Sequence, residues 1–173
     1  MVNGHYNDLM LALRYVYVLA LVVWLGGMVV LGAIVAPTTF QVLQAGDPDT
    51  GRALAGAVFG ATLARFHHVA YGAGVLLVLT LAAMRVLGPA PAAYGVRTLI
   101  VAAMLGAAAY SGVIVRERLD RVQHDAGGLP SRLPAGDPRR VEFDALHALS
   151  TRLMMATMIG ALALLYWEAK EHA

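Results

Sequence analysis

The chain has 173 residues, of which 59% are hydrophobic and 14% are charged, and its formal net charge is +2. Soluble domains carry roughly 45–50% apolar and about 25% charged residues, so these values exclude an ordinary soluble domain. The small net charge gives no sign of a nucleic-acid partner. Cysteine is absent, which excludes disulfides, thiolate metal sites, iron–sulfur clusters and covalently attached c-type haem. Any metal or haem would therefore need His, Met, Tyr or carboxylate ligands.

Four apolar stretches are long enough to cross a bilayer. A spanning helix needs about 20 mostly apolar residues, and a lone strand in lipid would leave its backbone groups without hydrogen bonds. The sequence therefore predicts an all-α membrane protein, with the whole chain forming one four-helix transmembrane bundle. The helices are expected at about 11–36, 66–86, 96–115 and 146–168, with a polar loop at 116–144.

The regions beside these stretches leave two structural questions open. Pro37 is expected to end or kink the first helix, because proline lacks the backbone donor and clashes with the preceding turn. Residues 52–65 have helical character and either lie at the interface or extend the second helix. Glycines on the first three helices permit close packing between helices and between copies of the chain; they are Gly26, Gly27, Gly32, Gly72, Gly74, Gly106 and Gly112.

Basic residues are distributed unevenly between the two ends of the predicted bundle. The termini and the second loop share one end and carry Arg14, Arg85, Arg97 and Lys170. The first and third loops share the other end and carry nine arginines: Arg52, Arg65, Arg116, Arg118, Arg121, Arg132, Arg139, Arg140 and Arg152. Cytoplasmic loops are enriched in Lys and Arg. We therefore expect loops 1 and 3 in the cytoplasm and both termini outside.

Three histidines are expected at similar depth, because the second and fourth helices enter the membrane from the same side. They are His67 and His68 on the second helix and His147 on the fourth. Ionisable groups in spans are costly and usually face the bundle interior or a polar cavity. Neighbouring residues on a helix point about 100° apart, so only one of the histidine pair can face a given site.

The histidines predict a cofactor or metal site between the second and fourth helices. Imidazole is the commonest metal ligand, and bis-His or His/Met ligation suits b-type haem. His147, Met154 and Met158 share one helix face, and such a His/Met set also suits copper(I). Arg65 and Arg152 would pair with haem propionates. The alternative is that the histidines form a polar border at the membrane surface and the methionines fill the core.

Three segments carry a family resemblance. They are Val-Val-Trp-Leu-Gly-Gly-Met at 22–28, Arg-Phe-His-His at 65–68, and Phe-Asp-Ala-Leu-His-Ala-Leu-Ser-Thr at 143–151. The chain resembles the transmembrane-protein-205-like family, four-helix membrane proteins also called domain of unknown function 4149. It is more distantly similar to the haem-carrying membrane protoporphyrinogen oxidase family and to the copper-resistance D family.

The distant resemblances imply haem b or copper as the bound group. In the oxidase family a haem-ligating histidine precedes the tryptophan by one or two turns, whereas here Tyr17 stands at that position. The oxidase reaction is therefore not carried over, and a haem would need His67 or His68 together with His147. His68 is favoured, because Gly72 one turn later would open space beside it. His68, His147 and Met154 are the corresponding metal ligands.

The sequence thus predicts a small protein of the bacterial inner membrane that binds haem b or a metal ion, for electron transfer or for cofactor or copper handling. The alternative is a structural or transport-associated subunit without a cofactor, and a third interpretation is an oxidoreductase acting on a quinone or porphyrin. No catalytic residue is assigned, and enzyme activity is left open. Expected partners are the lipid bilayer and other membrane or redox proteins.

Overall fold

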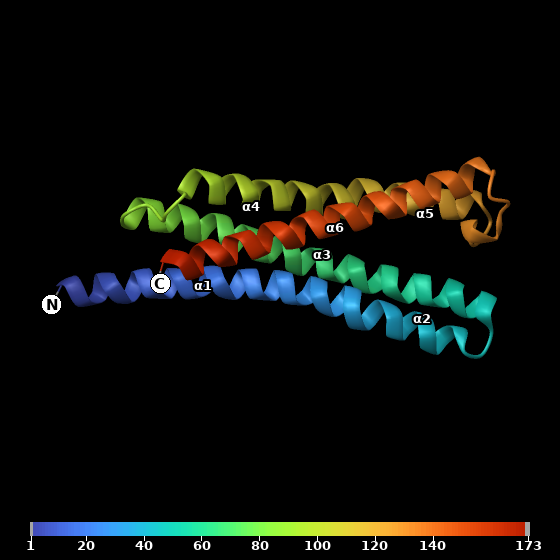
Figure 1. Cartoon of the computed structure of the whole chain (residues 1–173), viewed down its shortest axis with the longest axis horizontal. Helices are drawn as coiled ribbons and strands as arrows, with labels where there is room; N and C mark the ends of the chain where they lie inside the picture. Colours follow the sequence, from blue (N-terminus) through green and yellow to red (C-terminus); the bar gives the residue numbers. More distant parts are fainter. Residues whose placement is uncertain (1, 172–173) are drawn as a thin grey trace.

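The computed structural model describes residues 2–171, apart from the side chains of residues 2–4 and 49, as long helices along one axis (Figure 1). In chain order the elements are α1 (Val2–Val30), η1 (Leu31–Val35), α2 (Ala36–Gln44), α3 (Pro48–Leu87), α4 (Tyr94–Ala109), η2 (Tyr110–Val115), α5 (Arg116–Asp125), η3 (Pro130–Arg132) and α6 (Pro138–Glu171). Here η1 and η2 are π-helical and η3 is a short 3₁₀ helix.

Four continuous helical segments are long and apolar enough to cross a membrane, which confirms the predicted fold class. They cover His5–Gln44, Thr50–Leu87, Tyr94–Asp125 and Pro138–Glu171. Both termini and the α3–α4 connection lie at one end of the bundle, called here the terminal end. The α2–α3 and α5–α6 connections lie at the other, called here the loop end (Figure 1).

The helix at residues 52–65 is an extension of the second span, because α3 runs unbroken over its 40 residues. At 1.5 Å per residue this helix is about 60 Å long, roughly twice the hydrocarbon thickness of a bilayer. In its first turn, the backbone N–H of Gly51 donates to the Asp47 carbonyl at 2.8 Å. A Cβ at Gly51 would collide with the Leu43 backbone, so this position requires glycine.

Pro37 kinks the first helix and does not end it. The π-helical segment η1 directly precedes the first turn of α2, which contains Pro37, and the helix continues to Gln44. A wider π turn accommodates the proline ring, which would otherwise clash with the carbonyl four residues earlier. Figure 1 shows α2 leaning away from the axis of α1.

The predicted polar loop at 116–144 is mostly helical, and only residues 126–137 connect α5 to α6. The polar composition reflects solvated helix faces, because Arg121 donates to Glu117 one turn earlier at 2.8 Å, a pairing that supports an exposed helix. The connection begins at Gly127 and Gly128, whose positive φ angles of 66° and 155° favour glycine. The polar composition of residues 116–144 indicates a loop, but the structure has α5 and the first turns of α6 there.

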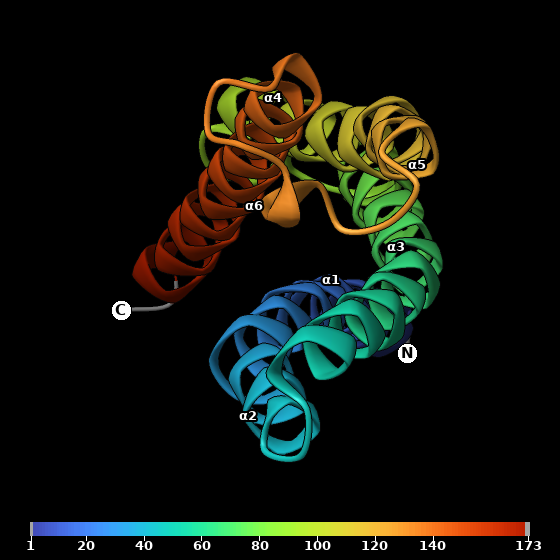
Figure 2. The same ribbon diagram turned by 90° about the vertical axis from the view of Figure 1, so that its right-hand side faces the viewer.

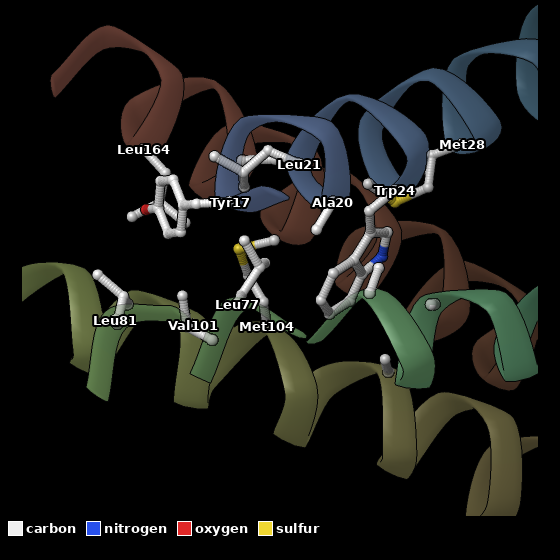
Figure 3. Close-up of a cluster of buried hydrophobic side chains, with 14 of the residues drawn as sticks. Tyr17, Ala20, Leu21, Trp24, Met28, Leu77, Leu81, Val101, Met104 and Leu164 are labelled. Carbon is white, nitrogen blue, oxygen red and sulfur yellow. The ribbon is translucent and has the colours of Figure 1, made fainter. Parts of the chain in front are cut away.

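The main core lies in the terminal half of the bundle, where all four long helices pack together. Figure 3 shows Tyr17 and Trp24 of α1 pointing into the bundle beside Leu77 of α3 and Met104 of α4. At the loop end the molecule opens, since α2 packs on α3 and α5 packs on α6. Figure 2 shows these two hairpins standing apart.

Candidate functional site

A cavity of about 60 Å³ lies where the packed core gives way to the open loop end. All four spanning segments contribute to its wall. The lining side chains that carry heteroatoms are Trp24, Met28, His67, Ser111, Ser150, Met154 and Thr157. The other lining residues are apolar, so the cavity presents one indole, one imidazole, two thioethers and three hydroxyl groups in an otherwise hydrocarbon wall.

His67 presents a defined ring nitrogen at this cavity. Its Nδ1 lies 2.8 Å from the Leu63 carbonyl oxygen. A carbonyl can only accept, so Nδ1 carries the proton, and in the neutral ring Nε2 keeps its lone pair. Metal-binding histidines commonly donate their second ring nitrogen to a backbone carbonyl in this way, which fixes the tautomer. The local helix thus prepares Nε2 of His67 to act as a ligand or acceptor.

Glycine at position 112 makes room for the His67 ring. A Cβ built on Gly112 would collide with that ring and with the Tyr71 hydroxyl. Tyr71 in turn donates to the Ala108 carbonyl at 3.4 Å. Gly112 belongs to η2, and π-helical turns are frequent at functional sites.

The hydroxyl groups of the cavity are partly engaged by protein groups. The Ser111 and Ser150 hydroxyls lie 3.3 Å apart, and Thr157 donates to the Leu153 carbonyl at 2.9 Å. The contact between the two serines joins η2 to α6 across the cavity wall, whereas the Thr157 bond lies within α6. The thioether side chains of Met28 and Met154 and the imidazole of His67, whose Nε2 takes no part in the Leu63 contact, are the candidate metal donors of the wall.

Other residues predicted for the cofactor site lie outside the cavity. The side chains of His68, His147, Arg65 and Arg152 are exposed, and the His147 ring stacks on Phe143 at 6.3 Å between centroids. Among the described residues, no group of three or more His, Asp or Glu side chains is arranged to hold a metal ion.

The structure places His67, rather than His68, on the cavity side of α3. The preference for His68 rested on Gly72 as a source of space within the bundle. Gly72 lies on the exposed face and has no other side chain within 4 Å, so the space it opens is outside the bundle. Of the other predicted ligands, Met154 lines the cavity, whereas Met158 packs against the core.

A second polar cluster, which sequence reasoning missed, lies at the terminal end. Arg97 of α4 is completely buried and donates to Glu168 of α6 at 2.7 Å and to Glu171 at 2.9 Å. Glu171 also accepts from the backbone N–H of Ala92 at 3.0 Å and lies 3.7 Å from Arg14. The available signal was the pair of glutamates, three residues apart, at the end of an apolar helix.

Tyr17 borders this terminal cluster and does not face the cavity. Its ring is fully buried, and its hydroxyl lies beside the Arg97 guanidinium without a well-aligned hydrogen bond. The tyrosine that the sequence comparison expected at a haem-ligand position therefore lies at the charged end of this bundle.

The four long apolar helices, with a largely apolar cavity between them, define a multi-pass membrane protein. The family described as "Domain of unknown function (DUF4149)" matches residues 19–127, and the chain belongs to this family. The match includes Trp24, Met28, His67 and Ser111 but not α6. Comparison with curated proteins and with solved structures gave no match.

Proposed function

We propose that this protein binds a soft metal ion, copper(I), in the cavity between its four helices and takes part in copper handling. The observation that carries the proposal is the donor set of the cavity, which consists of the His67 imidazole and the thioethers of Met28 and Met154. Soft thioether ligands select copper(I), and imidazole also suits copper. The distant resemblance to the copper-resistance D family supports the same assignment.

The size of the cavity favours an ion over a large organic cofactor. A volume of about 60 Å³ gives room for roughly four water molecules. Pockets that enclose drug-sized ligands measure about 300–1,000 Å³, and a porphyrin would need a comparable space. The two π-helical segments, η1 and η2, supply Leu31 and Ser111 to the wall and give this part of the bundle its irregular packing.

Haem b bound by His67 or His68 with His147, and with Arg65 and Arg152 at its propionates, stays a prediction. The geometry gives it less support than copper, because the side chains of His68, His147, Arg65 and Arg152 are exposed and would need rearrangement or an added partner to enclose a haem. A Soret band in the purified protein that changes in His147→Ala would favour haem over copper.

The alternative of a structural or transport-associated subunit is supported by the loop end. Exposed apolar side chains there include Val42, Leu54 and Val58, which are 65%, 51% and 43% exposed. Gly56 and Gly60 on the same part of α3 have no other side chain within 4 Å. A partner protein or a second copy would cover this surface, and a cofactor-free subunit would co-purify with such a partner.

Anaerobic titration with copper(I) against a competing chelator tests the proposed function. We expect one tight site per chain, weakened by at least about tenfold in His67→Ala and Met154→Leu, since even outer-shell partners of a metal have effects of that size. Matched controls are His68→Ala and Met155→Leu, whose side chains are exposed neighbours on the same helices. Absence of a tight site, or equal weakening in the controls, would contradict copper binding.

We further propose that the protein resides in the bacterial inner membrane, with the loop end in the cytoplasm and the termini outside. The nine arginines of the loop end support this orientation. Because the chain has no cysteine, single substitutions report orientation directly. In intact cells, Ala92→Cys should react with an impermeant maleimide and Ser131→Cys should not; the reverse pattern would invert the topology.

A further inference from the structure

A groove of about 450 Å³ opens on the surface between α1 and α6, at the terminal end. Its apolar wall is formed by Leu11 and Val18 of α1 and by Leu165 and Ala169 of α6. Arg14 and Glu168 supply one charge of each sign to the same groove. The groove shares no lining residue with the cavity of the proposed copper site, so a ligand bound here is independent of copper binding.

The groove lies at the depth where a bilayer changes from hydrocarbon to headgroups. Arg14 is four residues before Val18, and the continuous helical segment formed by α1, η1 and α2 has no charged residue between Arg14 and its end at Gln44. Tyr15, which is 67% exposed, stands at the rim, and tyrosine is enriched at membrane–water interfaces. A ligand here would have apolar contacts toward the bilayer centre and charged contacts toward the water.

The charges of the groove match a zwitterion and not an anion. The Arg14 side chain is 32% exposed, and its guanidinium has the forked donors that suit a phosphate. Nearby, Glu168 and Glu171 balance Arg14 and Arg97, so the site has no excess positive charge to attract an anionic lipid. A carboxylate is also a good acceptor for a primary ammonium group.

We propose that this groove binds an aminophospholipid of the phosphatidylethanolamine class. The phosphate pairs with Arg14, the primary ammonium pairs with Glu168, and one acyl chain lies along Leu11, Val18 and Leu165. Phosphatidylcholine is disfavoured because its quaternary ammonium has no N–H to donate. Phosphatidylglycerol is disfavoured because it has no cation to place beside Glu168.

Native mass spectrometry of the detergent-purified protein, titrated with the three lipids bearing identical acyl chains, tests the proposal. We expect phosphatidylethanolamine to be retained roughly fivefold better than the other two lipids, as expected for one partly exposed ion pair. Arg14→Gln should lower its retention by a similar factor. Glu168→Gln should remove the preference over phosphatidylcholine.

Two further variants keep the result interpretable. Arg85→Gln is the matched control for Arg14→Gln, since Arg85 is an exposed arginine at the same end of the bundle and should leave retention unchanged. Ala169→Phe fills the groove at an exposed position without touching the core, and should lower retention of all three lipids. Equal retention of the three lipids by the wild-type protein, or full retention in Ala169→Phe, would overturn the proposal.

Discussion

The two polar clusters of this bundle use buried heteroatoms in opposite ways. At the terminal end, Arg97 pairs with Glu168 at 2.7 Å and with Glu171 at 2.9 Å. In the cavity, the His67 imidazole and the thioether side chains of Met28 and Met154 line a shared space. Paired charges hold helices together, whereas lone pairs that converge on a cavity are suited to bind a ligand. We therefore assign a structural role to the pairing of Arg97 with Glu168 and Glu171, although Glu168 also borders the proposed lipid groove, and we propose metal binding in the cavity.

Removing the buried guanidinium should have the largest effect on stability. Arg97→Ala leaves Glu168 and Glu171 without their common partner, and breaking a buried pair typically costs about 3–5 kcal/mol. Denaturant unfolding of the detergent-solubilised protein measures this loss. Arg85→Ala, an exposed counterpart, should change the free energy of unfolding little. If Arg97→Ala were as stable as the wild-type protein, the terminal cluster would not have the structural role assigned to it.

A methyl group at position 112 should displace the His67 ring, which lines the cavity. Gly112→Ala pushes a Cβ into the His67 ring and the Tyr71 hydroxyl, and overpacking of this kind costs about 1–3 kcal/mol. Copper(I) affinity should fall together with stability. Gly106→Ala on α4 has no neighbour within 4 Å and should be neutral or stabilising. If Gly112→Ala and Gly106→Ala change stability and copper(I) affinity equally, the close packing of His67 on η2 does not contribute to copper binding.

Exchanging one cavity thioether should separate binding from stability. Met28→Leu conserves volume, so the free energy of unfolding should change by less than about 1.5 kcal/mol. The lost sulfur ligand should nevertheless weaken copper(I) binding in the chelator competition. Met158→Leu, in the core but outside the cavity wall, is the control. A Met28→Leu variant that binds copper as tightly as wild type would exclude Met28 as a ligand.

The smallest effect on stability is expected at the ion pair between Asp137 and Arg139, which lies at the protein surface, unlike the buried Arg97 cluster. Hydrogen bonds from Arg139 lower the pKa of Asp137 to about 2, so the stabilisation it provides is present above its usual pKa of 3.8 and is lost as pH falls toward 2. Asp137 also caps α6 by accepting from the backbone N–H of Arg139 at 2.9 Å. Asp137→Asn should speed amide exchange in the first turn of α6 only. The exchange is measured between about pH 4 and 6, because Asp137 is ionised there both in the folded protein and at its usual pKa. Faster exchange throughout α6 would contradict a purely local role.

The first three spans could be predicted because their charge-free runs are long enough to cross a bilayer. The fourth run, 153–167, reaches that length only when it is extended past Arg152 toward His147. The ends of the spans could not be predicted, since α5 and the start of α6 are polar helices that composition does not distinguish from a loop. The choice between His67 and His68 also lay beyond the sequence. Both faces of α3 are apolar, so periodicity does not reveal which one faces the bundle.

The terminal cluster was missed for a different physical reason. An arginine at the end of an apolar run normally lies at the membrane surface, and Arg97 was counted among such residues. Its burial depends on Glu168 and Glu171, more than 70 residues later in the chain, brought near by the packing of α4 on α6. Met28 had a visible signal, because it stands one turn after Trp24 on the same helix face.

X-ray absorption spectroscopy of the copper(I)-loaded protein tests the central claim most directly. A metal held by the cavity should show thioether sulfur and a single imidazole nitrogen in its first shell. The sulfur contribution should fall in Met154→Leu and stay unchanged in Met155→Leu. A first shell of nitrogen and oxygen alone, or a sulfur signal unaffected by Met154→Leu, would contradict binding in the cavity.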